Sequence, residues 1–474
     1  MIVGYAIPAV QKFQGAAYKS LYYQALENSK ADGATPDDNP CLIARGDELY
    51  RAGAGAVPSV LIVPQFVKPG AVYTQIPTPT VEAGDFDQFT FTRATTATRV
   101  NASGLIESVA SGLLRLDYPV TGGCPAALIE PAATNLFARS NELNIGAPWT
   151  QDNIVFTTGS TSAFTSPDGT TNAFLMADTS GNTRHRISQQ PTTSFVSGTT
   201  YTASIFVKKN SSSRFLLING NTAFGAMAAL NLDTLAITNI NGSGASIDNY
   251  GNGWYRFSIR GTATSTQATS IFIQMQNNAT DSPYIGDGSS FYLYGAQLET
   301  GAIPTSYIPT TTASATRNAD VCSVTGVSGY IGQTEGTLYA EVDLRNINTG
   351  AFRRIIDVTD GTSGNRLQIQ TNNTDSKIRI SIFTAGSEVW VFTSSLTYTG
   401  ITKIALAYKN NDTAYYVNGS LVSGTTSITV PATNRIQLGS TYDGASFLND
   451  RIRAAAIYTT RLSNDQLASL TRLT

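Results

Sequence analysis

The sequence of 474 residues has very little histidine and cysteine and contains no long apolar run. Its one histidine, His185, would have to serve any Ser-His-Asp or Cys-His catalytic device, and the neighbours Arg184 and Arg186 disfavour a protonated imidazole. We therefore expect His185 to be a loop or strand-surface residue without a catalytic role. GxSxG, HExxH and Walker-type motifs are also absent, which excludes the common hydrolase and nucleotide-binding signatures.

The three cysteines, Cys41, Cys124 and Cys322, are odd in number and far apart, without CxxC spacing. This pattern predicts neither a disulfide framework nor a standard zinc cluster. No run approaches the length of a membrane span, and no basic segment precedes an apolar core at the N-terminus, so we expect neither membrane insertion nor a secretion signal. The net charge is −2 and no long basic run occurs, so we do not expect the protein to bind nucleic acid. We expect a protein made in a cytoplasm.

Charged residues make up only 14% of the chain, whereas glycine (41 residues) and tyrosine (22 residues) are plentiful. Short runs that alternate apolar and polar residues, such as 201–209 and 291–299, are separated by Gly and Asn clusters typical of turns. Because these runs lack βαβ spacing, an antiparallel sandwich or jelly roll is favoured. We predict a mainly β chain with two β-sandwich or jelly-roll domains, preceded by a small helix-containing anchor and a β-rich collar.

The chain divides at changes of composition and periodicity. Helical spacing marks 16–30 and 42–51, prolines punctuate 57–80, and within the seam 291–320 Pro304, Pro309 and a threonine run predict a tether. The predicted parts are a docking or assembly segment (1–60), a collar or linker with short strands (61–138), a first β-sandwich (139–312) and a second β-sandwich (321–474).

Two local signals mark the last part. Asn418-Gly419 between two strand-like runs predicts a type I′ hairpin. Ser463 followed three residues later by Gln466 predicts a capping box, and Leu467, Leu470 and Leu473 would share one face of the helix that it opens.

Several motifs resemble those of tailed-bacteriophage proteins. FTFTRATTATRVNASGLIE, LRLDYP, GGCPAALIEPAATNL and ARSNEL resemble the linker motif of phage fibre and head-spike proteins. GAQLETGAIPTSYIPT with ATRNAD is similar to the end of the carbohydrate-binding-module-like domain of the same group. KIALAYKNNDTAYYVNGSLV, followed by RIQLGSTYDGASFLNDRIRAAAIYTTRLSNDQLASL, resembles the laminin-G-like concanavalin A jelly roll.

The resemblance implies a structural virion fibre, with the head favoured over the tail, that displays lectin-like domains for adhesion to host surface polysaccharide. It also implies a homotrimer on the virion surface, attached to a capsid or tail protein through residues 1–60. Two alternatives stay open: a tail fibre or tailspike with glycan-degrading activity, and a purely decorative capsid protein.

A sugar site needs exposed aromatic rings with polar side chains beside them, because saccharide rings present apolar faces as well as hydroxyls. Five residues have the chemical character that such a site requires. They are Trp254, Arg256, Tyr292, Tyr294 and Trp390. Alternation in 254–260 places Trp254 with Arg256 on the wetter strand face. Each aromatic side chain could equally serve to pack a β-sandwich.

Catalysis is not expected. A glycosidase needs two carboxylates flanking the scissile bond. Glu341 and Asp343 share one face of a predicted strand, but Asn346 occupies the place of the third carboxylate in the pattern of jelly-roll glucanases. We interpret the pair as part of a polar outer face and predict that the protein is not an enzyme.

No cofactor is implied, apart from calcium at one loop. Asp443, Asn449 and Asp450 in TYDGASFLND supply the hard oxygen ligands that calcium prefers. Asp and Asn also favour turns, so a turn without calcium would account for the same three residues.

Overall fold

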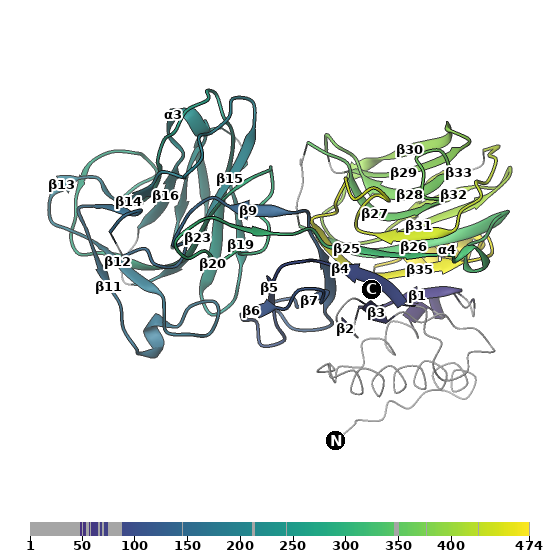
Figure 1. The fold of residues 1–474 in the computed structure, drawn as a ribbon, viewed down its shortest axis with the longest axis horizontal. Coiled ribbons are helices and arrows are strands. Elements are labelled where there is room, and N and C mark those ends of the chain that lie inside the picture. The colour runs from purple at the N-terminus through teal and green to yellow at the C-terminus, as the bar shows by residue number, and fades with distance from the viewer. Residues whose placement is uncertain are drawn as a thin grey trace, which may run out of the picture.

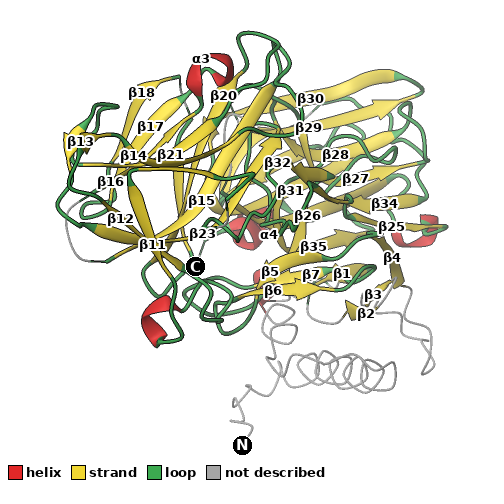
Figure 2. Cartoon of the chain, turned by 60° about the vertical axis from the view of Figure 1, so that its left-hand side comes forward, coloured by secondary structure: helices red, strands yellow, loops and turns green. Residues whose placement is uncertain are grey.

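The protein is described by a computed structural model over residues 48–49, 51–53, 56, 58–64, 67–68, 71–73, 88–144, 146–210, 214–242, 244–345, 350–375, 377–424 and 426–473. The predicted helix 16–30 lies outside these ranges, and within 42–51 the described residues Glu48, Leu49 and Arg51 are helical. The chain is mainly β, as predicted, and forms two sandwiches side by side (Figures 1 and 2). No described helix is long and apolar enough to cross a membrane.

The first sandwich is built from one continuous stretch of chain. Its strands are β10 (Thr150–Asp152), β11 (Ile154–Thr157), β12 (Phe174–Asp178), β14 (His185–Gln189), β15 (Thr200–Lys209), β16 (Phe215–Asn219), β17 (Met227–Asn231), β18 (Ile237–Asn241), β19 (Ser246–Asn249), β20 (Trp254–Thr262), β21 (Ile271–Gln276) and β23 (Ser290–Thr300). They form two six-stranded antiparallel sheets, β10-β14-β21-β16-β17-β18 and β11-β12-β23-β15-β20-β19. The small pieces β13 (Asn182–Thr183) and α3 (Asn221–Phe224) lie on its periphery (Figure 1). β22 (Tyr284–Ile285) pairs with β13, and η1 (Ser162–Phe164) lies between β11 and β12 in the chain.

Alternation along β15 explains how the first core forms. Tyr201, Ala203, Ile205 and Val207 all belong to the core of the first sandwich, as their period-2 spacing predicts. The opposite face of the same sheet does not face solvent, because a second cluster of aromatic residues covers it.

The second sandwich draws its strands from two distant parts of the chain. Its eight-stranded sheet contains β1 (Val60–Ile62), β7 (Arg115–Asp117), β8 (Ala126–Ile129), β26 (Glu335–Leu344), β31 (Gly400–Lys409), β32 (Ala414–Val417), β33 (Ser420–Gly424) and β35 (Asp450–Tyr458). Its nine-stranded sheet contains β2 (Val67–Lys68), β3 (Ala71–Tyr73), β4 (Gln88–Thr92), β25 (Val321–Thr325), β27 (Arg353–Thr359), β28 (Arg366–Thr371), β29 (Lys377–Thr384), β30 (Ser387–Thr397) and β34 (Arg435–Leu438).

Strands of the predicted collar are therefore hydrogen-bonded into the second sandwich. Strand β1 pairs with β35, β4 pairs with β25, and β8 pairs with β35. Their side chains enter its core as well, since Val60, Phe91 and Leu116 pack in one cluster with Leu338 and Ile404. Apolar burial of this kind is the main stabilising contribution to a fold, so these distant segments fold as one unit.

The two local signals near the C-terminus are confirmed. Asn418 and Gly419 both have positive φ, 48° and 85°, and join β32 to β33 as a type I′ turn requires. Ser463 and Gln466 form the capping box of α4 (Asn464–Thr471). Leu467 and Leu470 are buried, whereas Leu473, which was predicted to share their face, is exposed.

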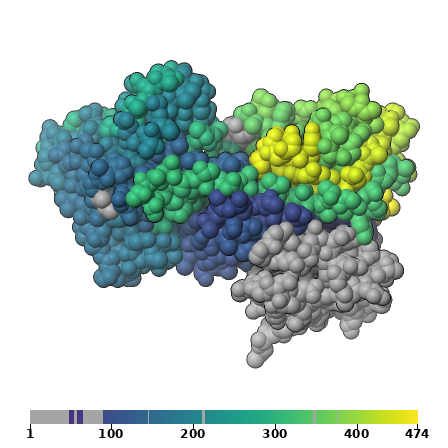
Figure 3. All heavy atoms as spheres, viewed as in Figure 1, coloured from purple at the N-terminus to yellow at the C-terminus, as the bar shows by residue number. Residues whose placement is uncertain are grey.

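Short elements and the seam fill the space between the sandwiches (Figure 3). Strands β5 (Ala97–Val100) and β6 (Ile106–Val109) form a hairpin, β9 (Ala133–Asn135) pairs with β24 (Ala315–Arg317), and η2 (Ser328–Tyr330) follows the seam. The seam was predicted as a tether, yet Tyr307 and Ile308 within it are buried.

The two described cysteines are in different states. Cys124 is disulfide-bonded, whereas Cys322 is a buried free thiol in β25.

Candidate functional site

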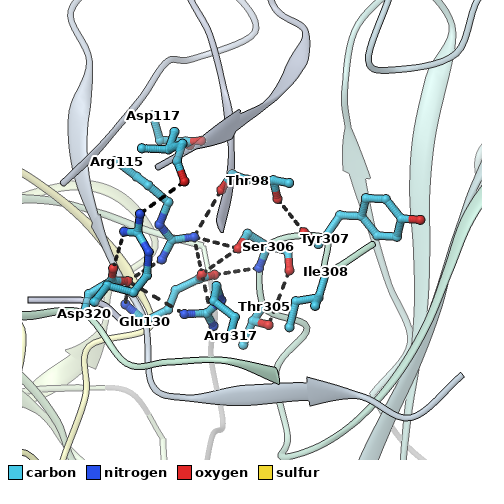
Figure 4. A network of polar contacts seen from close by, with 12 residues as sticks. Thr98, Arg115, Asp117, Glu130, Thr305, Ser306, Tyr307, Ile308, Arg317 and Asp320 are labelled. Carbon is cyan, nitrogen blue, oxygen red and sulfur yellow. Dashed lines mark hydrogen bonds and ion pairs between the residues drawn. The ribbon is translucent and has the colours of Figure 1, made fainter. Parts of the chain in front are cut away.

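A buried network of ion pairs joins the collar to the seam between the two sandwiches (Figure 4). We call it the junction network; its members are Arg93, Arg115, Glu130, Ser306, Arg317 and Asp320. Arg115 donates to Glu130 at 2.6 Å and also to Asp320, while Arg93 donates to Asp320 at 2.9 Å. The side chains in these pairs are at most 4% exposed.

The seam enters this network through both backbone and side chain. The Ser306 amide donates to Glu130 at 2.7 Å, and the Ser306 hydroxyl donates to the other Glu130 oxygen at 2.8 Å. Arg317 lies 3.3 Å from Glu130 and donates to the Pro131 carbonyl. Because Ser306 follows the first sandwich and Asp320 directly precedes β25 of the second, the network fixes one sandwich relative to the other.

The charges of the network are stabilised mutually. Burial by itself would raise the pKa of Glu130, but Arg115 and Arg317 hold it well below its usual range. Burial opposes the charge of Arg115 as well, but Asp320 and Glu130 raise its pKa above the ordinary value. Glu130 is consequently ionised near neutral pH and cannot serve as a proton donor there.

A cleft of about 650 Å³ opens beside this network, and we call it the junction cleft. Three parts of the chain line it. The collar contributes residues 98–100, 106, 117–122, 128 and 130, the first sandwich and seam contribute 247–250, 256 and 304–307, and the second sandwich contributes 343, 345, 400–401, 449, 451 and 453. Pockets of this volume between domains are preferred places for ligands.

The cleft walls carry arginines that carboxylates hold in place. Arg451 pairs with Asp117 at 2.6 Å, and Arg345 pairs with Asp343 at 2.8 Å. A guanidinium has five N–H donors, so an arginine held in this way keeps donors for a ligand. Asp248 of the first sandwich is half-buried and adds an acceptor on the facing wall. The arrangement offers directed donors and acceptors for a polyhydroxylated ligand.

The prediction that Trp254 lies on the wetter strand face is wrong, because its side chain is only 1% exposed. The alternation along β20 correctly predicts that Trp254 points away from the main core. On that opposite face, however, Trp254 packs with Phe164, Tyr292 and Tyr307 in the second aromatic cluster. Its indole N–H donates to the Thr165 carbonyl at 3.0 Å. The loop that carries Phe164 covers this face of the sheet.

The other predicted sugar-binding residues are buried too. Tyr292 and Tyr294 belong to the same aromatic cluster, and Trp390 packs in the core of the second sandwich. Arg256, 2% exposed, donates to the Thr305 carbonyl and the Ser204 hydroxyl and also lines the junction cleft. The described structure thus brings Arg256 to a candidate site but leaves no exposed ring among the four aromatic residues for stacking on sugar.

The predicted calcium ligands do not fit a calcium site. Asp450 is fully buried and accepts from Arg353 at 2.8 Å, so a guanidinium occupies the place of a cation. Asp443 accepts from the Thr441 hydroxyl, and Asn449 lines the junction cleft. In the described ranges, no group of three or more His, Cys, Asp or Glu side chains could hold a metal ion.

Residues considered for catalysis lie in structural roles. Glu341 is buried and accepts from Arg453 at 2.7 Å, on the sheet face opposite the core residues Leu338 and Val342. His185 is buried in β14 with its Nδ1 atom 2.7 Å from the Asn153 carbonyl, so its predicted surface position is wrong.

Comparison with known proteins supports the fold of the second sandwich. Residues 305–468, less than half of the chain, match the family described as the concanavalin A-like lectin/glucanases superfamily (Laminin_G_3). This match confirms the predicted concanavalin A-like jelly roll. No curated protein matches the chain.

Solved structures give weaker likenesses. The CBM40 of the Ruminococcus gnavus IT-sialidase is 18% identical, covers 30% of this chain and 84% of its own, and has a TM-score of 0.25. Domain 4 of a GH43 arabinanase from Geobacillus stearothermophilus, in complex with arabinotriose, is 14% identical, covers 36% and 82%, and has a TM-score of 0.27. Mouse laminin α1 domains LG4-5 are 11% identical, cover 59% and 85%, and have a TM-score of 0.22.

Sequence reasoning missed the junction cleft and its arginines. Arg345 and Arg451 lie far from Asp117 and Asp248 in the chain, and no local pattern relates them. One signal was available: ATR occurs at 97–99 and 315–317, and its arginines occupy the collar wall of the cleft and the junction network.

Proposed function

We propose that this protein is a structural fibre of a tailed-bacteriophage virion, attached at the head, that adheres to host surface glycans. The junction cleft is the observation that carries the glycan-binding part. The phage part rests on the resemblance of the collar and seam motifs to those of phage fibres. In this proposal residues 1–60 attach the fibre to the capsid, and the protein is a homotrimer on the virion surface.

The chemistry of the cleft supports a saccharide as its ligand. Sugar hydroxyls both donate and accept hydrogen bonds, and the cleft offers guanidinium donors beside carboxylate and amide acceptors. The ion pairs of Arg345 and Arg451 orient these donors before a ligand arrives, which reduces the entropy lost on binding. Several copies on one particle would turn a weak single-site affinity into firm adhesion.

The paired state of three cleft carboxylates, Asp117, Glu130 and Asp343, favours binding over turnover. A glycosidase needs one carboxylic acid that gives up a proton and a second carboxylate free to act on the sugar. In the cleft Glu130 is held ionised by two arginines, and Asp117 and Asp343 each face an arginine. We therefore propose a protein without enzymatic activity.

A glycan-array measurement on the full chain tests the binding proposal, followed by titration of the best neutral or acidic ligand. The variant Arg345→Gln removes a cleft donor and is expected to weaken binding about tenfold, as loss of a charged hydrogen bond does. Arg472→Gln makes the same change at an exposed position in the C-terminal tail and should leave binding unchanged. Equal affinity of Arg345→Gln and the unaltered protein would refute the assignment of the cleft.

Two further measurements separate this proposal from its rivals. Incubation with capsular polysaccharide should release no new reducing ends; their appearance would indicate a glycan-degrading tailspike. Labelling of the protein in intact particles by electron microscopy should place it on the head, and labelling of the tail would overturn that position. A silent array together with normal phage adsorption would favour a decorative capsid protein.

A further inference from the structure

Four arginines lie on the outward face of the nine-stranded sheet, on four neighbouring strands. They are Arg435 on β34, Arg354 on β27, Arg366 on β28 and Arg379 on β29. They alternate with residues of the core, so their side chains stand on the opposite face. We call this surface the arginine face. It is separate from the junction cleft, which none of the four lines.

The strand register arranges the arginines in two rows. Arg435 and Arg366 lie in one row, on either side of Thr359. Arg354 and Arg379 lie in another row, on either side of Gln370. Strands are about 4.8 Å apart, so two arginines that flank one strand stand about 10 Å apart at the backbone, and their long side chains can converge on one ligand.

The row between the two arginine rows already has its hydrogen bonds. The Gln368 amide donates to Asp357 at 2.8 Å, and the Ser381 hydroxyl donates to Gln368 at 2.8 Å. The second Asp357 oxygen accepts from the Tyr442 amide at 3.1 Å. Asp357 therefore accepts hydrogen bonds from neutral donors, and the polar side chains of this middle row are hydrogen-bonded to one another.

The arginine rows, in contrast, are only partly engaged. Arg379 donates to Glu388 at 3.0 Å, Arg435 donates to Gln437 at 2.7 Å, and the Phe352 ring lies against Arg354 and Arg379. Other donors of the same side chains have no acceptor among the described residues. Arg354 is only 8% exposed, yet its Nε and Nη1 atoms have no hydrogen-bond partner among the described residues, and the same holds for Nε of Arg366, Arg379 and Arg435. Burial, with the nearby Arg366 and Arg379, lowers the pKa of Arg354 to about 10 although Asp357 raises it. Folded proteins rarely leave buried donors unmatched, and such groups require an explanation.

An acceptor without a partner lies beside these donors. Gln370 stands directly opposite Arg354 in the register, and its Oε1 atom is buried without a hydrogen-bond donor in the described part of the chain. A bare anion would satisfy the arginines but not this oxygen. A ligand that carries both an anionic group and hydroxyls would satisfy both.

We propose that the arginine face binds an acidic saccharide, with its carboxylate or sulfate group between Arg354 and Arg379 and a hydroxyl donating to Gln370. This inference rests on the proposed adhesion to glycans and names a chemical class of ligand for a second site. Arginine recognises carboxylate and sulfate oxygens through paired N–H donors, which a neutral sugar cannot use.

The test uses the full chain and matched pairs of ligands in calorimetric titrations. The probes are a galacturonic acid hexasaccharide with its neutral methyl ester, a chondroitin sulfate hexasaccharide with its desulfated and esterified form, and inorganic sulfate. At least one acidic probe should bind about tenfold more tightly than its neutral counterpart and weaken as salt rises. Arg354→Met should remove that preference while Arg472→Gln keeps it.

Stability supplies a readout that a structural role would not match. Arg354→Met keeps the apolar length of the side chain and removes a buried guanidinium whose Nε and Nη1 atoms have no hydrogen-bond acceptor among the described residues, so the melting temperature should stay equal or rise. A large fall in melting temperature would mean that Arg354 serves the fold and would overturn the proposal. So would equal affinity of each acidic probe and its neutral form, or saturation by sulfate alone with no added affinity from a saccharide. If neutral glycans still bind and Arg345→Gln still weakens them, the cleft proposal stands although this one fails.

Discussion

The two sandwiches reach similar architectures by different routes through the sequence. All strands of the first lie between Thr150 and Thr300, in one continuous stretch. The second takes β1 to β4, β7 and β8 from before the first sandwich and the remaining strands from after it. The first is thus inserted into the second, and the junction network lies where the chain leaves one and returns to the other. The first sandwich, which is continuous in sequence, should therefore be able to fold alone, whereas the second needs strands from both sides of the first.

The two sandwiches also differ in how they treat their outer faces. In the first, Trp254, Tyr292 and Tyr294 on the outer face are covered by a loop and by Tyr307 of the seam. In the second, the arginine face carries charged groups whose donors are not all matched. Aromatic residues on a strand therefore mark a packing surface here, and the polar surfaces are the candidates for binding.

The largest expected effect separates the two sandwiches as fragments. A fragment of residues 136–312 should fold, because it holds both sheets of the first sandwich. A fragment of residues 321–474 should not, because it lacks β1, β4, β7 and β8 and their core side chains. Circular dichroism and thermal unfolding of both fragments check this. A cooperative transition of 321–474 at the melting temperature of the full chain would contradict it.

Next in size is the loss of the buried charge that connects the sandwiches. Asp320→Ala leaves Arg93 buried without its carboxylate and Arg115 with Glu130 alone, and should lower the free energy of unfolding by about 3–5 kcal/mol. Asp412→Ala breaks the ion pair with Arg461, in which the Asp412 side chain is 54% exposed, and should cost about 0–1 kcal/mol. Denaturant unfolding measures the free energy of unfolding of both variants. Equal decreases would show that the buried network stabilises the protein no more than an exposed ion pair does.

A smaller effect tests the covered aromatic face. Trp254→Phe removes the hydrogen bond to Thr165 and part of the packing, so it should cost about 1–3 kcal/mol of stability. Ile285→Ala, at a side chain that is 70% exposed, should change stability by less than about 0.5 kcal/mol. Glycan binding should be unchanged in both variants. A loss of binding in Trp254→Phe without a loss of stability would restore the predicted sugar-binding role.

The smallest expected effect is a change in pH dependence. The lowered pKa of Glu130 means that its contribution to stability is present above about pH 4.3, the unfolded value, and is lost as pH falls toward the folded value. Below about pH 4, Glu130→Gln should lose stability more slowly than the unaltered protein, by up to about 1.4 kcal/mol per pH unit. Denaturant titrations between pH 3 and 7 measure the two slopes. Parallel slopes would mean that Glu130 is not held ionised by its arginines.

Local patterns predicted much of the fold and little of the candidate sites. The period-2 runs, the Asn418-Gly419 turn and the Ser463 capping box each depend on residues adjacent in the chain, and each was confirmed. The polar face of β20 was also assigned correctly, but its exposure was not. A strand's alternation reports which side chains share a face and contains no information about which distant loop covers that face.

The sequence by itself determined that this protein is mainly β, that it holds two sandwiches, and where its turns and last helix lie, because backbone propensity and periodicity act over a few residues. Only the tertiary structure decided which strands complete the second sandwich, which aromatic residues are buried, and where arginines from distant segments meet carboxylates. Those outcomes depend on contacts between residues hundreds of positions apart, such as Asp117 and Arg451. Their charges are stabilised only when the whole chain has closed around them.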